Sequence, residues 1–185
     1  MAKAFSDDPS IRYLLGGKSE GPDDWRYFYC ILNAIYDKCI ILSTDSSISS
    51  LLILFPPQLK SEPAIRFLLN GGFGLIRYFG FSHLFRSVNY EMNCEKIKKR
   101  FLTQQTWYCM CFVVDPKMQR RGIGSKLLRP VLGTLETYNT RLYLETHKTV
   151  NVAIYNKFGF KTVDISTIPD TGIKQYAMLF ENCKQ

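Results

Sequence analysis

The sequence predicts a single domain of the α/β class. Its 185 residues are the usual size of one domain, and no repeat, linker or low-complexity block divides them, so we expect one domain over residues 1–185. Hydrophobic residues make up 46% of the chain and aromatic residues 14%, which suffices for a packed core and argues against disorder. The apolar patterns run in the order helices, strands, helices, and then strand–helix–strand–helix–strand.

The first part of the chain predicts two helices followed by a hairpin. A helix is expected over residues 8–15, because a proline stands where its first turn begins. A second helix is expected over 22–37, which opens with one proline and two aspartates. Residues 39–44 and 47–55 are apolar and β-branched on either side of an Asp-Ser turn, a pattern typical of two hairpin strands.

The middle of the chain predicts more helices and then a buried strand. Residues 62–70 and 71–85 have helical composition, but four glycines interrupt them. Residues 87–101 predict a separate helix whose basic C-terminal end suits the helix dipole. Residues 106–114 are aromatic and β-branched without clean alternation, which favours a central strand.

The last part of the chain alternates helices and strands. A one-sided apolar stripe predicts a helix, in which Pro130 should cause a bend; the stripe consists of Leu127, Leu128, Val131, Leu132 and Leu135. Residues 141–146 predict a strand. A short helix follows, with Asn151 as its N-cap and Gly159 just past its end, and residues 174–180 predict the final strand.

Charge and cysteine content limit the possible partners. The net charge of +8 favours a polyanion such as nucleic acid, an anionic membrane or a phosphorylated cofactor, but it does not choose among them. The six cysteines form no Cys-x-x-Cys pair and there are two histidines, so we expect no metal site and reduced thiols in a cytoplasmic protein. Cys109 and Cys111 should share one face of their strand. The start lacks the apolar run of a signal peptide, and the apolar run at 51–55 is too short to span a bilayer.

The stretch DPKMQRRGIGSKLL, residues 115–128, suggests a phosphate-binding turn. A Walker loop is absent, and the dinucleotide fingerprint fails because Leu127 replaces its third glycine. A third possibility is a helix N-terminus whose free amides face an anion, with Gly122 and Gly124 allowing close approach and two arginines adding charge. A pyrophosphate fits that arrangement, although a glycine-bearing turn with solvated arginines would have the same sequence.

Gln119-x-x-Gly122-x-Gly124 after an apolar strand resembles the acetyl-CoA loop of the GNAT superfamily of N-acetyltransferases. The following helix, LYLET and NVAIYNKFGF agree with that family in order and spacing. AFSDDP, TWYCMCFVVDP and YLETHKTVNVAIYNKFGF resemble the subgroup that includes puromycin N-acetyltransferase. The resemblance implies a mixed, mostly antiparallel sheet with a splayed pair of parallel strands and helices on both faces. That subgroup usually has a strand before its first helix, and this chain starts almost at the helix.

The resemblance also implies a binding site for acetyl-CoA, the co-substrate. The pantetheine arm would pair with strand backbone as an added strand does, and the turn would hold the pyrophosphate with help from Lys126. The residues expected to bind the cofactor are Phe112, Val113, Val114, Gln119, Arg120, Arg121, Gly122, Ile123, Gly124, Ser125, Asn151 and Tyr155. Buried strand and helix-capping roles would explain several of them equally well.

Two residues are expected to carry the chemistry. Tyr155 matches the family's acid tyrosine, and a phenol with a pKa near ~10 is protonated at neutral pH and can donate to the departing thiolate. Glu145 could accept the proton of the attacking amine, directly or through water, and a structural role for it is as plausible. His147 lies nearby but is not part of the family pattern. No acyl-enzyme nucleophile is recognisable, so transfer should be direct in a ternary complex.

The sequence therefore favours acetyl transfer to the amine of a small molecule by a monomer or homodimer without a nucleic-acid or membrane partner. Acetylation of a protein or peptide amine, a non-catalytic acyl-CoA-binding protein and a basic nucleic-acid-binding module, suggested by the basic run at 95–100, are the alternatives. The candidate aromatic walls of the acceptor site are Tyr27, Tyr29, Phe67, Phe73 and Tyr78, and core packing would explain them equally well.

Overall fold

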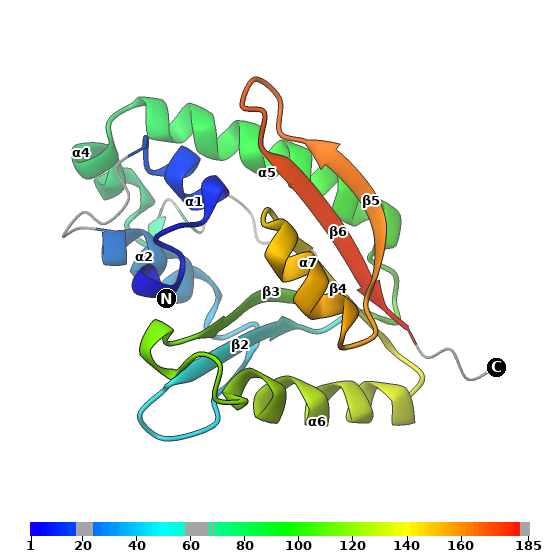
Figure 1. The fold of residues 1–185 in the computed structure, drawn as a ribbon. Coiled ribbons are helices and arrows are strands. Elements are labelled where there is room, and N and C mark those ends of the chain that lie inside the picture. The colour runs from blue at the N-terminus through cyan, green and yellow to red at the C-terminus, as the bar shows by residue number, and fades with distance from the viewer. Residues whose placement is uncertain (18–23, 58–66, 68, 182–185) are drawn as a thin grey trace.

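A mixed six-stranded sheet organises the computed structural model, which describes residues 1–17, 24–57, 67 and 69–181 (Figure 1). The strands are β1 (Ile40–Leu42), β2 (Ser50–Phe55), β3 (Thr106–Val114), β4 (Arg141–Thr146), β5 (Lys161–Thr167) and β6 (Lys174–Phe180). Their order in the sheet is β1-β2-β3-β4-β6-β5. In the described residues β3 and β4 are parallel and the other neighbours are antiparallel, so the predicted mixed sheet is confirmed.

Helices cover both faces of this sheet (Figure 1). They are α1 (Pro9–Leu14), α2 (Asp24–Ile35), α4 (Leu75–Phe79), α5 (Ser82–Phe101), α6 (Ile123–Thr137) and α7 (Thr149–Asn156), with short 3-10 turns at Ala2–Ala4, Gly72–Gly74 and Pro116–Met118. Apolar side chains of α6 and α7 pack on one face in a cluster that includes Leu128, Leu142 and Tyr155. Side chains of α2 and α5 pack on the other face, around Ile53 and Tyr143.

The local signals for the N-terminal helices are confirmed in the described residues. The Asp8 carboxylate caps α1 by accepting the backbone N–H of Ser10 at 2.9 Å and of Ile11 at 3.3 Å. The second predicted helix is present as α2 from Asp24 onward, and its predicted start at 22 lies outside the described residues. The helix expected over 62–70 also falls largely outside them.

One expected element boundary was wrong, and one strand was not predicted. The helix predicted to begin at residue 87 starts at Ser82, because no glycine or proline separates Ser82 from Phe101 and Gly80, with φ of 77°, already ends α4. The strand β5 was missed altogether. It pairs with β6 at the edge of the sheet and leaves Lys161 and Thr162 exposed, so its sequence lacks a clean apolar alternation.

A β-bulge in β3 overturns the expectation that Cys109 and Cys111 share one face. Ile53 of β2 pairs with Cys111, and the next residue, Leu54, pairs with Cys109, so Met110 is an extra residue in β3. The Cys109 side chain packs with α6 and α7, whereas that of Cys111 packs on the α2 face. Both are free thiols, and burial raises the pKa of each.

The parallel strands β3 and β4 separate at this bulge. Their pairing begins at Thr106↔Arg141 and ends at Cys109↔Leu144. Beyond that point β3 continues beside β2 as far as Val114, and β4 continues beside β6 as far as Thr146. Among the described strands none therefore pairs with the second half of β3 on its β4 side, and the resulting opening positions the candidate site.

Candidate active site

The turn between β3 and α6 presents a row of backbone amides. Gly122 is the N-cap of α6 with φ of 75°, a left-handed conformation that favours glycine. The first helical bond of α6 runs from the Lys126 N–H to the Gly122 carbonyl at 3.0 Å. The N–H groups of Ile123, Gly124 and Ser125 precede that bond, and the cap has no side chain to satisfy them, so they are placed to bind an anion at the positive end of the helix dipole.

The second glycine of the turn has a different role. A Cβ atom at Gly124 would lie 3.2 Å from Cζ of Phe112 and 3.5 Å from Cγ2 of Val114. Glycine therefore lets the first turn of α6 approach the unpaired end of β3 closely. Gly122, by contrast, has open space where its Cβ would be, so its backbone conformation is what requires glycine there.

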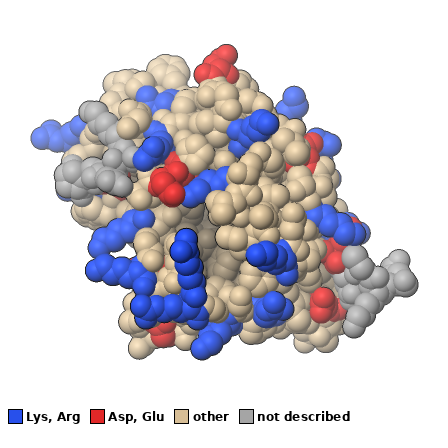
Figure 2. Space-filling view, in the orientation of Figure 1, with Lys and Arg blue, Asp and Glu red and all other residues tan. Residues whose placement is uncertain are grey.

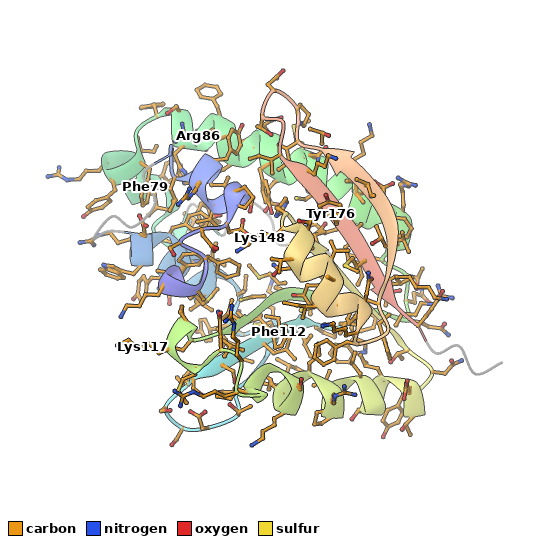
Figure 3. All side chains as sticks on the ribbon, in the orientation of Figure 1. Phe79, Arg86, Phe112, Lys117, Lys148 and Tyr176 are labelled. Atoms are coloured by element: carbon orange, nitrogen blue, oxygen red, sulfur yellow. The ribbon has the colours of Figure 1, made fainter. Side chains whose placement is uncertain are left out.

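Basic side chains surround this turn. Lys117, Arg120, Arg121 and Lys126 are exposed, and Figure 2 shows Lys and Arg side chains gathered beside the hollow on this face, over the β3–α6 connection. Figure 3 shows Lys117 in that connection, with Phe112 between β3 and α6. A polyanion approaching the hollow would thus meet positive charge.

The unpaired end of β3 offers backbone groups toward the opening. The Asp115 N–H donates to the Ser49 carbonyl at 2.8 Å, so the alternation of an antiparallel pair points the N–H and C=O of Val113 toward β2. Those of Phe112 and Val114 point the other way. Gln119 Nε2 donates to the Val114 carbonyl at 3.3 Å, which agrees with this orientation. Of the three strand residues expected to pair with a pantetheine arm, Phe112 and Val114 have the fitting orientation.

Tyr155 is held in the opening by aromatic contacts. It is on α7 and is 9% exposed, with its ring centroid 6.4 Å from that of Phe112 and 5.5 Å from that of Phe160. Its hydroxyl makes no hydrogen bond to another described residue. Burial raises its pKa well above the ordinary value, so the phenol stays protonated and is able to act as a proton donor.

Glu145 is a half-buried carboxylate with three donors. Oε2 accepts from the Tyr108 hydroxyl at 3.0 Å, and Oε1 accepts from the Tyr143 hydroxyl at 3.1 Å and from Gln175 Nε2 at 3.3 Å. Burial raises the pKa of Glu145 to about 6, although the nearby Lys98 ammonium and the two phenols oppose that shift. At neutral pH the carboxylate is ionised and able to accept a proton.

The helix that carries Tyr155 begins earlier than expected. Lys148 is the N-cap of α7, so the prediction that Asn151 caps this helix was wrong. Asn151 lies within the first turn, and its Nδ2 donates to Thr146 Oγ1 at 3.0 Å, which ties α7 to the end of β4. The expected role of Gly159 past the helix end is confirmed, with φ of 91° and a Phe160 N–H bond back to the Tyr155 carbonyl at 3.2 Å.

A cavity of about 160 Å³ gathers several predicted site residues. Phe112, Glu145, Asn151 and Tyr155 all line it, although they come from β3, β4 and α7. Its remaining lining residues are Met1, Phe5, Asp8, Ser10, Ile11, Tyr27, Phe28, Ile31, Tyr90, Glu91, Tyr108, Cys109, Met110, Cys111, Leu144, Thr146 and His147. The turn residues 119–125 do not line it and lie at the far end of the unpaired strand.

The aromatic candidates for the acceptor wall divide between two places. Tyr27 lines the cavity, and the Phe67 ring packs against it at 6.3 Å. Tyr29 and Tyr78 instead line a separate depression of about 230 Å³, and Phe73 is exposed. The sequence did not single out Tyr90, Glu91 and Tyr108 for this wall, because no local motif marks them.

His147 also lines the cavity, and its ring is fixed by a contact with the Tyr90 ring, whose centroid is 5.6 Å away. Its Nε2 atom is buried without a hydrogen-bond partner among the described residues. Burial holds the pKa of His147 below its ordinary value, so the ring is neutral at neutral pH. Sequence position alone gave His147 no role, since only the structure shows its free ring nitrogen.

Residues 99–181 match the sequence family described as "Acetyltransferase (GNAT) domain". Over these residues, a little under half of the chain, the sequence is similar to GNAT acetyltransferases. The match contains the unpaired strand, the amide turn, Glu145 and Tyr155, while α1, α2 and the start of α5 lie outside it. No curated protein matches the chain. No described helix is long and apolar enough to cross a membrane.

Solved structures share this GNAT fold. The structure of histone acetyltransferase HPA2 and related acetyltransferase from Corynebacterium glutamicum has a TM-score of 0.62 at 19% identity and covers 100% of this chain and 88% of that one. The structure of PH1933 from Pyrococcus horikoshii has a TM-score of 0.52 at 20% identity and covers 95% of this chain and 92% of that one. At these identities the likeness shows the fold alone. Together the family match and the fold support an acetyl-transferring enzyme.

The finer resemblance to the puromycin N-acetyltransferase subgroup has only weak support. Nourseothricin acetyltransferase is similar over 42% of this chain and 50% of that one, with a TM-score of 0.36 and 16% identity. A likeness at that level carries no argument about the acceptor. The cavity, which is lined partly by α1 and α2 outside the matched residues, is therefore the basis for an inference about the acceptor amine.

Proposed function

We propose that this GNAT domain moves an acetyl group from acetyl-CoA to the amine of a small molecule by direct transfer in a ternary complex. The observation that carries the proposal is the unpaired edge of β3, which leads from the amide turn at Gly122 to a cavity lined by both Tyr155 and Glu145. An extended donor arm can add to that edge as a strand does, with its anionic end at the turn.

The residues of the turn and strand fit the donor. The amides of Ile123 to Ser125 would hold the pyrophosphate, and the exposed Arg120, Arg121 and Lys126 would add positive charge. The backbone groups of Phe112 and Val114 would bind the pantetheine arm, with Gln119 and Asn151 beside it. Acetyl-CoA supplies the activated acetyl group, as it does for the family.

Tyr155 and Glu145 would then divide the proton transfers. Glu145 takes the proton from the acceptor amine, directly or through water, because its carboxylate is ionised above pH 6. Tyr155 donates its proton to the departing thiolate, because its raised pKa keeps the phenol protonated. An acceptor that binds as an ammonium first loses one proton to water, and its neutral nitrogen then bonds the acetyl carbon as the carbon–sulfur bond breaks, which yields an amide and a free thiol. The proton taken by Glu145 returns through water to the Tyr155 phenolate, so both side chains regain their starting states.

Binding and turnover can be measured separately. Calorimetry with acetyl-CoA should give a Kd in the micromolar range, and a panel of primary amines should release the thiol of coenzyme A in a colorimetric assay. Initial rates should follow a sequential pattern, whereas ping-pong kinetics would contradict direct transfer. Turnover with peptide amines in place of small amines would show a protein acceptor, and binding without turnover with any amine would show a non-catalytic acyl-CoA-binding protein.

A further inference from the structure

We propose that the acceptor is a cationic primary amine with an apolar or aromatic body and without a carboxylate or phosphate next to the amino group. This inference rests on the proposed acetyl transfer, because it concerns the acceptor side of the same cavity. It separates simple amines from α-amino acids and from phosphorylated amines, which the family match does not distinguish.

The charge of the cavity is opposite to that of the chain. Three carboxylates line it, those of Asp8, Glu91 and Glu145, against one described cation, the α-ammonium of Met1, and no described lysine or arginine lines it. The chain as a whole has 24 basic and 16 acidic residues. A cavity lined by one sign of charge focuses the field and attracts the opposite charge, so the lining favours an ammonium group.

The nearest lysines do not cancel this field. Lys98 is buried behind the wall, where its ammonium lies 3.2 Å from Glu95, 3.8 Å from Glu91 and 5.0 Å from the centre of the Tyr108 ring. Lys148 donates at 2.6 Å to Asp7, which does not line the cavity. Lys98 also acts on Glu145, but it is shared with Glu95 outside the lining. With the Met1 ammonium counted as well, the three lining carboxylates still outnumber the positive charges of the lining.

His147 adds no positive charge and leaves a hydrogen-bonding position free. Its ring is neutral at neutral pH, because burial lowers its pKa more than the nearby Asp8 carboxylate raises it. The buried Nε2 atom has no partner among the described residues. A buried polar atom without a partner costs free energy, which a hydrogen bond from a bound acceptor would recover.

Aromatic rings form much of the remaining wall. Phe5 stacks on Phe28 with ring centroids 5.6 Å apart, and Tyr27 meets Phe28 edge to face at 5.4 Å. Tyr90 and Tyr108 line the same cavity on its α5 and β3 sides. Such walls bury the apolar body of a ligand, and ring faces also attract an ammonium.

The same groups would reject an acceptor that carries its own anion beside the amine. A carboxylate on the carbon next to the amino group would enter the cavity with it, among three carboxylates and with the Met1 α-ammonium as the one described cation of the lining. Like charges and an unpaired buried anion both disfavour that complex. The cavity therefore discriminates by repulsion as well as by attraction.

Matched pairs of acceptors test this inference. Tyramine should be acetylated with a kcat/KM at least about 100-fold above that of L-tyrosine, and phenethylamine should exceed L-phenylalanine similarly. L-tyrosine methyl ester should regain most of the lost rate, because the ester removes the negative charge. Equal use of amines and amino acids would overturn the proposal, as would acetyl-CoA binding without turnover of any of these amines. Failure of acetyl-CoA to bind in calorimetry would instead refute the proposed function itself.

A variant that removes one negative charge tests whether the charge of the lining causes this preference. Glu91 is an exposed carboxylate at the cavity, and Glu91→Gln leaves Lys98 paired with Glu95, so the fold should persist. We expect the KM for tyramine to rise about tenfold, with kcat little changed, and the preference for tyramine over L-tyrosine to shrink. Asp170→Asn, at an exposed carboxylate away from the cavity, is the matched control and should change neither value. An unchanged preference in Glu91→Gln would contradict the electrostatic explanation.

Discussion

The amide turn before α6 and the wall of the cavity are built in opposite ways. The turn comes from one contiguous stretch, residues 115–126, and it is exposed, basic and rich in glycine. The wall is assembled from α1, α2, α5, β3 and β4, and it is aromatic and acidic. The two regions meet at the unpaired edge of β3. The difference indicates that one end of the opening is suited to an anion and the other to a cation, so that two substrates of opposite charge can lie side by side.

Of the changes considered, removal of the Tyr155 hydroxyl should have the largest effect on kcat. Tyr155→Phe keeps the ring against Phe112 and Phe160 but removes the proton donor, so we expect kcat to fall about 1,000-fold. The Kd for acetyl-CoA should stay within about twofold, as measured by calorimetry. Tyr138→Phe, at a residue that is 74% exposed, serves as the control. A variant with wild-type kcat would remove Tyr155 from the chemistry.

The pH dependence of turnover should depend on Glu145. Its raised pKa of about 6 means that the carboxylate becomes protonated as pH falls below 6, so kcat/KM should fall about tenfold per pH unit there. Glu145→Gln should lower kcat about 100-fold and abolish that acidic limb. If the limb persisted in Glu145→Gln, another group would have to accept the proton.

The same carboxylate gives a stability control that does not require turnover. Because the folded state raises the pKa of Glu145 from 4.5 to about 6, its contribution to stability is fully present below pH 4.5 and is lost as pH rises through 6. Glu145→Gln should therefore gain stability relative to the wild type over that window, by up to about 2 kcal/mol. Denaturant unfolding at pH 4 and pH 7 measures the difference.

The turn can be altered without touching the cavity. Gly122→Ala places a side chain on a residue with φ of 75°, which costs about 1–2 kcal/mol and shifts the amide row. We expect acetyl-CoA to bind about tenfold more weakly, while the relative preference among amines stays unchanged. Gly133→Ala, in the middle of α6 with nothing near its Cβ position, should leave binding unchanged and raise stability slightly. Wild-type affinity in Gly122→Ala would refute the amide row as the anion site.

The smallest effect is expected from one exposed charge of the turn. Arg121→Gln should weaken acetyl-CoA binding about threefold at low salt, and the difference should fade at high salt because exposed charges are screened. Lys174→Gln, an exposed charge on β6, is the control. A loss that did not depend on salt would indicate a structural role for Arg121 instead of a long-range one.

The sequence was most informative where the candidate site is built from a contiguous segment. The strand at 106–114, the turn and the helix after it follow one another along the chain, so apolar patterns and glycine spacing were enough to predict them. The edge strand β5 was not predicted, because its exposed, polar residues show little alternation of apolar and polar side chains. The bulge at Met110 was not predicted, because one extra residue in a strand does not change its composition. The bulge places Cys111 on the α2 face of the sheet.

The acceptor wall could not be predicted for a different reason. Tyr27 was among the candidates, but Phe5, Tyr90 and His147 meet it only after α1, α2 and α5 have packed over the sheet, so no local pattern connects them. Asn151 shows the same limit on a smaller scale. Its residue type suits an N-cap, but α7 begins at Lys148 and the amide bonds Thr146 instead. The contact of Asn151 with the end of β4, and not its preference for helix N-caps, therefore determines where its side chain lies.

The bulge at Met110 also limits the length of strand edge that is open to pairing with another polypeptide. A strand edge with unpaired backbone N–H and C=O groups can pair with another polypeptide strand, and such pairing leads to aggregation. Here the bare segment is short, begins only after Cys109, and is crowded by the first turn of α6, where Gly124 lies against Phe112. This crowding favours a slender, flexible chain over a peptide strand, which carries side chains on both faces. The bare segment thus offers only a few backbone groups with which another polypeptide strand could pair.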